Sequence, residues 1–149
     1  MSRRKGRILA FQALYSWDVN HESIEDLLTF SWLEKENEGN EEVINKPLAN
    51  VNEERTFASL IIKGTIDNIT EIDKVITSHL ASDWSIDRLN RVTLALLRIG
   101  TYEIKYQSNV PSKIIIDEAV NIAKDYGTDD SYKFINAVLD KIGKDENKQ

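Results

Sequence analysis

Apolar residues recur at every third or fourth position along most of this 149-residue chain. Leu89, Val92, Leu96 and Ile99 illustrate the spacing, which places side chains on one face of an α-helix. The best candidate for a strand, residues 113–116, lies between residues that favour a helix. The sequence therefore predicts an all-α fold, a compact bundle of six or seven helices.

Residues that favour helix ends divide this pattern into segments. The predicted helices run from Arg3 to Trp17, from Ser23 to about Lys35, from Glu53 to about Leu80, from Ser85 to about Tyr106, from Ser112 to Tyr126, and from Asp129 or Asp130 to Gly143. In the third segment the apolar face shifts near Asn68, where Thr70 and Asp73 have the spacing of a helix-start cap, so we expect two helices or a kink. We expect Ser23, Ser85 and the aspartate to act as N-caps, and Gly127 and Gly143 to end their helices.

Residues 34–52 interrupt the helical pattern with an acidic segment that contains Gly39 and Pro47, and we expect a long connection there. A chain of this length builds one core, so we expect a single domain, residues 1–149. No apolar run approaches the roughly 20 residues of a membrane-spanning helix. Residues 1–6 lack the apolar core of a signal peptide. We therefore expect a cytoplasmic protein without a membrane partner.

The composition excludes several kinds of site. The chain has no cysteine, which excludes disulfide bonds, thiolate zinc sites and cysteine nucleophiles. Glycine-rich phosphate loops and common hydrolase motifs are absent from the sequence. Of the two histidines, we expect His21 on the surface and His79 at a helix boundary or in the core, and we expect Trp17, Trp32 and Trp84 in the core. We therefore predict no catalytic residue, no cofactor and no metal site.

The charge of the chain is unevenly distributed. The formal net charge is -6, yet residues 1–17 contain three arginines, one lysine and no acid. Residues 18–54 contain eleven acids and two bases, and the remainder is nearly balanced. A basic end on an acidic body favours a polyanion that is bound at one place and repelled elsewhere. The cations also oppose the macrodipole of the first helix, and such a departure from local stability is typical of a binding site.

Two sets of residues combine the side chains that bind single-stranded RNA, in which cations neutralise phosphates, rings stack on bases and amides read base edges. The first, here called the basic set, consists of Arg3, Arg4, Lys5, Arg7 and Gln12. The second, here called the aromatic set, consists of Tyr126, Lys133, Phe134 and Asn136. A solvated terminus remains the alternative interpretation of the basic set.

Three segments also carry a family resemblance. Residues 3–17, RRKGRILAFQALYSW, are similar to a pattern R-x-x-A-R-x-x-A-x-Q-A-L-Y. Residues 91–104, RVTLALLRIGTYEI, are similar to ILR-x-A-x-YEL. Residues 116–127 and 131–140, IDEAVNIAKDYG and SYKFINAVLD, are similar to INEAVELAKxFG and FVNGVLD. In order and spacing, nearly the whole chain thus resembles the NusB family of bacterial transcription antitermination factors.

The resemblance implies an all-helical fold of two small bundles without catalytic activity. It implies two partners, the boxA element of RNA leaders and NusE, a small-subunit ribosomal protein that also acts in transcription. Together they help RNA polymerase to read through terminators, chiefly in ribosomal RNA operons. The RNA-binding residues implied at the matching positions are Arg3, Arg4, Lys5, Arg7, Gln12, Tyr126, Asp130, Lys133 and Phe134. The implied NusE contacts are Tyr15 and Thr93.

Departures from the family pattern accompany this hypothesis. Gly6, Asp117 and Ala137 stand where the family usually has alanine, asparagine and glycine, and Gly6 predicts a looser N-terminal arm before RNA binds. Some relatives self-associate over the RNA surface, so a homodimer is compatible with the hypothesis.

Two alternative functions remain. One is a helical protein-interaction module without RNA binding. The other is an RNA-modifying enzyme, since some RNA methyltransferases carry a similar helical domain, but we expect no catalytic domain after Gln149.

Overall fold

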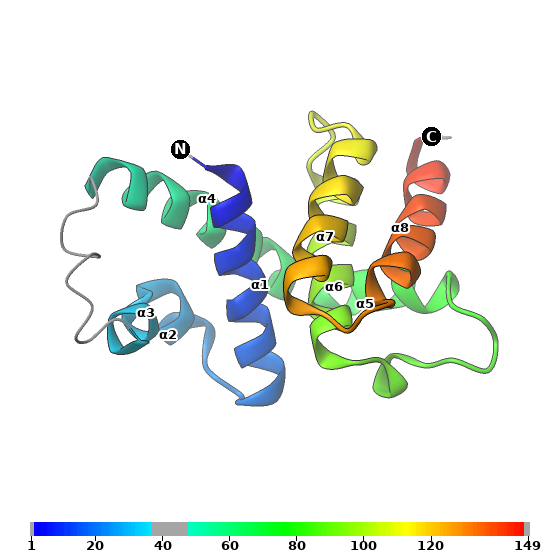
Figure 1. The fold of residues 1–149 in the computed structure, drawn as a ribbon, viewed down its shortest axis with the longest axis horizontal. Coiled ribbons are helices and arrows are strands. Elements are labelled where there is room, and N and C mark those ends of the chain that lie inside the picture. The colour runs from blue at the N-terminus through cyan, green and yellow to red at the C-terminus, as the bar shows by residue number, and fades with distance from the viewer. Residues whose placement is uncertain (1, 37–47, 148–149) are drawn as a thin grey trace. The chain divides into compact units, whose positions relative to one another are not determined.

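The computed structural model describes residues 2–36 and 48–147, and over these ranges the chain is helical without any strand (Figure 1). This confirms the predicted all-α fold, although the described residues form eight α-helices where six or seven were expected. Within the same ranges no helix has the length and apolar character of a membrane span. The elements are α1 (Arg3–Val19), α2 (Ile24–Thr29), α3 (Ser31–Glu36), α4 (Leu48–Asp67), α5 (Ile69–Ser78), the 3-10 turn η2 (Ile86–Arg88), α6 (Arg91–Tyr106), α7 (Ser112–Tyr126) and α8 (Ser131–Asn147).

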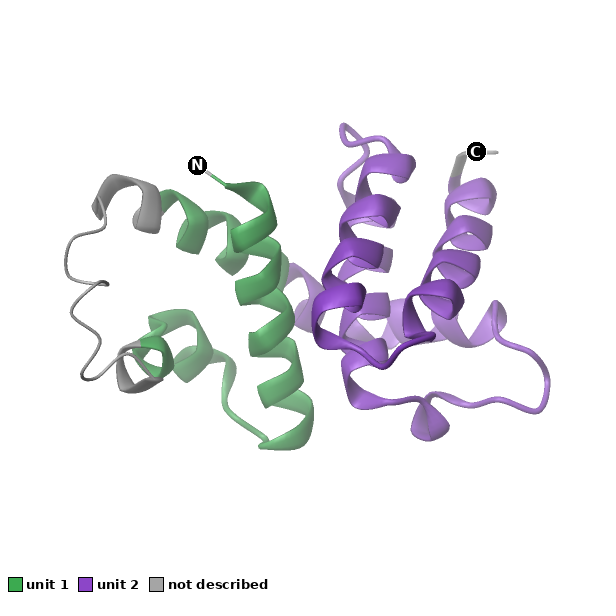
Figure 2. Ribbon diagram, in the orientation of Figure 1, with its two compact units in different colours: residues 1–63 green, residues 64–149 purple. Residues whose placement is uncertain are grey.

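The chain divides into two compact units, residues 1–63 and 64–149, coloured green and purple in Figure 2. The boundary between them falls within α4. Two small helical bundles are what the family resemblance implies.

In unit 1, one face of α1 is buried in the core. Its core side chains are those of Ala10, Phe11, Ala13 and Leu14 from α1, Leu27 and Phe30 from the α2 region, and Ala58, Ile61 and Ile62 from α4. In unit 2, α6 is the central helix, because it packs against α5, α7 and α8. Every residue of α6 from Thr93 to Ile104 is buried. The buried Arg98 forms a two-pronged ion pair with Asp73 on α5, with both N···O distances at 3.0 Å.

The helix expected from Ser23 to Lys35 is broken at Phe30. Ser23 caps α2 as predicted, because its hydroxyl accepts a hydrogen bond from the Asp26 N–H. Phe30, however, adopts a left-handed conformation with φ 57° and ends α2 before α3 begins. This conformation is costly for a bulky residue, and the burial of the Phe30 ring offsets the cost. Apolar spacing continues through the break, so periodicity alone did not reveal it.

The expected helix start at Ser85 is wrong by six residues. Ser85 precedes only the turn η2 and makes no side-chain cap bond, and α6 begins at Arg91. The cap is Asn90, whose side-chain oxygen accepts hydrogen bonds from the N–H groups of Val92 and Thr93. Asparagine in this position satisfies two of the helix's free N–H groups, which explains why α6 starts there.

The predicted break near Asn68 is confirmed, but the cap assigned there is wrong. The Asn68 side-chain amide donates to the Gly64 carbonyl at the end of α4, and α5 begins at Ile69. Thr70 therefore lies inside α5. The Asp73 carboxylate accepts a hydrogen bond from Arg98, so its spacing from Thr70, which resembles a helix-start cap, is coincidental.

Two further helix ends differ from the prediction. Gly127 ends α7 as expected, but in an extended conformation with φ -94°. Gly143 does not end α8, which continues to Asn147. A Cβ atom at Gly143 would lie 3.2 Å from the Ser112 Cβ, so this glycine allows α8 to approach the start of α7. The expected connection 34–52 is shorter, since α3 extends to Glu36 and α4 begins at Leu48, and residues 37–47 lie outside the described ranges.

Candidate RNA interface

The basic set lies on a helix that is fully formed from Arg3 onward. The Ser2 hydroxyl accepts a hydrogen bond from the Lys5 N–H at 3.2 Å. The Ser2 N–H donates to the Glu54 carboxylate at 3.3 Å. The first turn of α1 contains no acid of its own, so Glu54 on α4 supplies the negative charge that stabilises a helix N-terminus.

Only three of the four cations of the basic set are on the surface. Arg3, Arg4 and Lys5 are exposed, whereas Arg7 is only 5% exposed. The Phe57 ring contacts two of the guanidinium groups. Its centroid lies 5.4 Å from Cζ of Arg7 and 5.6 Å from Cζ of Arg3. Such cation–π contacts are stronger where water is excluded. In its buried position, Arg7 holds α1 against α4.

The burial of Arg7 has a signal in the sequence. Arg7, Phe11 and Leu14 follow each other at the spacing of one helix face, and that face is apolar. Charge alone groups Arg7 with its basic neighbours. Helix geometry separates Arg7 from Lys5, whereas Arg3 and Arg4 lie close to the same face.

Gly6 is part of the same packing and does not loosen the segment. It is buried inside α1, and a Cβ atom there would lie 2.6 Å from Cδ1 of Phe57. The expected looser arm is therefore wrong, because glycine here lets α1 approach the Phe57 ring. Gln12 and Tyr15 are half-buried on α1. Thr93, the other predicted NusE contact, is only 5% exposed on α6.

The aromatic set lies at the end of α7 and the start of α8. Tyr126 is 45% exposed. Asp130 and Lys133 are exposed and form an ion pair at 3.7 Å. Phe134 is half-buried, and Asn136 is exposed on α8. These residues thus lie near consecutive helix ends in unit 2, where the Tyr126 ring and the Lys133 side chain are exposed.

Trp84 does not lie in the core, where the sequence predicts it. We expected it in the core, but it is 44% exposed and lies just before η2. Its ring centroid is 6.3 Å from that of Phe134, and the Arg88 guanidinium lies 5.4 Å from it. The signal that could have placed it is its flanking sequence, Ser-Asp before it and Ser after it, which is polar and not helical in pattern. Trp17 and Trp32 are half-buried.

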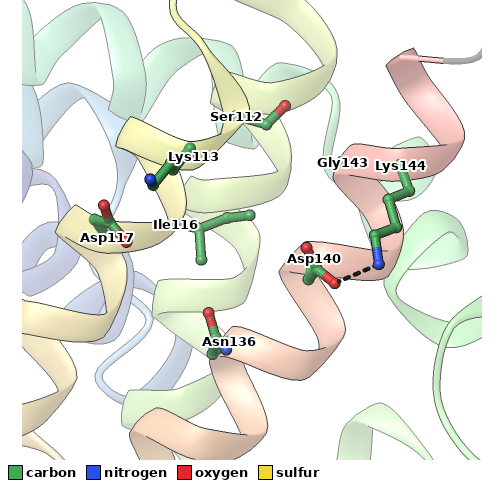
Figure 3. Close-up of a pocket in the computed structure, with 8 residues that line it drawn as sticks. All are labelled: Ser112, Lys113, Ile116, Asp117, Asn136, Asp140, Gly143 and Lys144. Carbon is green, nitrogen blue, oxygen red and sulfur yellow. Dashed lines mark ion pairs between the residues drawn. The ribbon is translucent and has the colours of Figure 1, made fainter.

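A groove of about 430 Å³ lies between α7 and α8 in unit 2, and Asn136 of the aromatic set is among the residues that line it (Figure 3). Figure 3 shows Asp117 and Lys113 on its α7 side and Asn136 and the Asp140–Lys144 ion pair, 3.1 Å long, on its α8 side. The two lysines and two aspartates balance each other. The groove therefore has no net charge that would attract an RNA phosphate. Asp117, which stands where the family usually has asparagine, lies in this groove.

The two histidines differ in their surroundings. His79 is partly buried, with Nδ1 2.8 Å from the Val75 carbonyl and Nε2 2.5 Å from the Asp145 carboxylate, as expected of a boundary histidine. His21 is exposed, as expected. Over the described ranges, no group of three or more histidine, aspartate or glutamate side chains is placed to hold a metal ion.

The model of the NusB family matches residues 4–144 of the chain. The chain belongs to the NusB family. This confirms the resemblance predicted from the three segments, which lie within the matched range except for Arg3.

Curated NusB relatives match nearly the whole chain. The transcription antitermination protein NusB of Treponema denticola is 53% identical over 142 residues, which cover 95% of this chain and 96% of the relative. The NusB protein of Borreliella burgdorferi is 41% identical over 138 residues, covering 91% of this chain and 89% of the relative.

Solved NusB structures confirm the fold. A structure of T. maritima NusB is similar with a TM-score of 0.76 and 32% identity, covering 100% of this chain and 99% of that one. A chain in a crystal structure of antitermination factors NusB and NusE in complex with dsRNA is similar with a TM-score of 0.77 and 29% identity, covering 96% of each chain.

Proposed function

We propose that this chain is a transcription antitermination factor that binds boxA-type single-stranded RNA together with ribosomal protein NusE. In this role it is a binding protein and not an enzyme. It acts in the cytoplasm and promotes read-through by RNA polymerase, notably in ribosomal RNA operons. The names of the curated relatives support the antitermination role, and the solved complex of NusB and NusE with dsRNA supports NusE and RNA as the classes of partner.

The observation that carries the proposal is the preformed basic turn of α1. Arg3, Arg4 and Lys5 are exposed on a capped helix end, although the chain as a whole is acidic. The basic set therefore attracts phosphates at one place, and the acidic remainder repels them. The aromatic set supplies rings for stacking on unpaired bases.

The roles within each set differ with exposure. We propose that Arg3, Arg4 and Lys5 contact phosphates directly, that Arg7 positions the helix that carries them, and that Gln12 reads a base edge. Tyr126, Lys133 and Phe134 contact RNA in the same proposal, and Asp130 orients Lys133 through their ion pair. Tyr15 offers a half-buried ring to NusE, whereas the buried Thr93 offers little surface.

A fluorescence titration tests this function. A labelled boxA-type RNA is titrated with the full chain, with and without purified NusE, and unlabelled boxA and scrambled RNAs are then added as competitors. We expect weak binding by the chain alone, tighter binding with NusE, and better competition by boxA than by the scrambled sequence. Size-exclusion chromatography of the same sample shows whether a homodimer is present and whether RNA dissociates it.

The second candidate is a helical protein-interaction module without RNA binding of its own. The net charge of -6 favours it, since most of the chain repels polyanions. Under this alternative, the chain binds NusE, but neither RNA binds with or without NusE.

A further inference from the structure

We propose that Trp84, held by Arg88 and Phe134, is a stacking site for one unpaired base of a bound RNA. This inference rests on the proposed RNA-binding function and adds a residue to it. Trp84 belongs neither to the basic set nor to the aromatic set. All three residues lie in unit 2.

The indole ring is held in place by two neighbours. The Arg88 guanidinium lies 5.4 Å from the Trp84 ring centroid and donates a hydrogen bond from Nη1 to the Asp83 carbonyl at 2.8 Å. The Phe134 ring, at 6.3 Å and tilted by 44°, supports the indole from α8. The backbone around Trp84 is also ordered, because the Trp84 N–H donates to the Ala81 carbonyl at 2.9 Å. A ring fixed in this way loses little conformational freedom when a ligand stacks on it.

The exposure of this ring is what requires explanation. Indole rings contribute most to stability when they are buried, yet 44% of Trp84 remains accessible beside a second aromatic ring. Exposed apolar surface that is rimmed by polar groups is typical of an interaction site. Here Arg88 and its partner Asp83 lie beside the ring, and both are exposed, as is Asp87 nearby in the sequence.

The chemistry around the ring favours a nucleic-acid base as the occupant. Phe134 belongs to the aromatic set, so Trp84 is continuous with a surface that we already assign to RNA. A guanidinium group against an indole ring forms a mixed stack on which a base can be added. The acids Asp83 and Asp87 offset Arg88, so the local charge does not attract phosphates. We therefore infer that this site binds a base through its face and contributes little to the salt dependence of RNA binding.

Replacement of the ring separates stacking from phosphate contacts. With the full chain, NusE and labelled boxA-type RNA, we expect Trp84→Ala to weaken RNA binding by at least about fivefold, the lower end of the effect of removing one stacked base. The slope of log affinity against log salt should stay as in the unmodified chain. Trp84→Phe should recover most of the affinity, because any aromatic face can stack. Ile114→Ala is the matched control, since Ile114 is 50% exposed in the same unit, and it should bind RNA normally.

Tryptophan fluorescence gives a second measurement that does not depend on the alanine variant folding. RNA should quench the emission of the unmodified chain, and most of this quenching should disappear in Trp84→Phe, which keeps the half-buried Trp17 and Trp32. Undiminished quenching in Trp84→Phe, or unmodified affinity in a folded Trp84→Ala, would overturn the stacking site while leaving the proposed function intact. Loss of NusE binding with unchanged RNA binding would also overturn it, in favour of a protein contact. If the unmodified chain binds no RNA at all, the proposed function fails as well.

Discussion

Arg4 and Arg7 are neighbours on α1, but the structure predicts that their replacement by alanine has different consequences. Arg4 is exposed near the capped helix end, so Arg4→Ala should remove a phosphate contact and leave stability nearly unchanged. Arg7 is buried against Phe57, so Arg7→Ala should lower stability and leave the number of phosphate contacts unchanged.

The magnitudes follow from the count of exposed cations. Four phosphate contacts would give the basic set a salt slope near -3 with single-stranded RNA, whereas the three exposed cations give about -2. Each lost phosphate contact makes the slope of log affinity against log salt shallower by about 0.7. When the salt concentration rises fourfold, the affinity of the variant should therefore fall about 2.6-fold less than that of the unmodified chain. The loss of the buried cation–π contact in Arg7→Ala should cost about 1–2 kcal/mol of unfolding free energy.

The assay is a titration of labelled boxA-type RNA at several salt concentrations, combined with thermal unfolding of each variant. Of these two variants, we expect a shallower salt slope only for Arg4→Ala, and a lower melting temperature, by about 2–8 °C, only for Arg7→Ala. Lys133→Ala on α8 removes an exposed cation of the aromatic set and should also make the salt slope shallower, by about 0.7. If Arg7→Ala flattens the salt slope as much as Arg4→Ala does, Arg7 must leave Phe57 to contact RNA, and the assignment of roles by burial is refuted.

Four further predictions concern stability. Asp73→Ala leaves the buried Arg98 guanidinium without its carboxylate partner and should lower the unfolding free energy in urea by about 2–3 kcal/mol, less than for a fully buried pair because Asp73 is partly exposed. Arg98→Met removes the buried charge itself and should lower the unfolding free energy by less, so equal losses in the two variants would contradict this prediction. Gly64→Ala places a Cβ atom against the Tyr102 ring and should cost about 1–3 kcal/mol; an unchanged denaturation midpoint would argue against this packing. Asn90→Ala removes the cap of α6 and should cost about 1 kcal/mol, while Asn90→Ser should retain most of the stability. Calorimetry should show one cooperative transition if residues 1–149 form one domain, and two separate transitions would contradict the single-domain prediction.

The helical class of the fold could be predicted because apolar periodicity is a property of each segment by itself. Helix ends were predicted less well, since they depend on competition between neighbouring caps. Asn90 begins α6 although Ser85 has a suitable side chain, because Asn90 bonds two N–H groups and Ser85 bonds none. The break at Phe30 depends on burying a ring in the core, which no local pattern encodes.

The types of residue in the candidate site could be predicted from the sequence, but which of their side chains are exposed was harder to predict. Charge identified the cations of α1, but the burial of Arg7 depends on Phe57, fifty residues further along the chain. Trp84 was assigned to the core because large rings are usually buried there. Its exposure follows from its position just before η2, outside the apolar faces of the helices that form the core.

The cap at Ser2 has a consequence for the thermodynamics of RNA recognition. Many arginine-rich segments fold only on contact with RNA, and part of their binding energy is spent on ordering the peptide. In this chain, Ser2 and Glu54 already close the first turn of α1, so the arginines are presented on a rigid support. RNA binding should therefore leave the far-ultraviolet circular dichroism of the protein unchanged, and the heat capacity should change far less than when a disordered arm folds on binding.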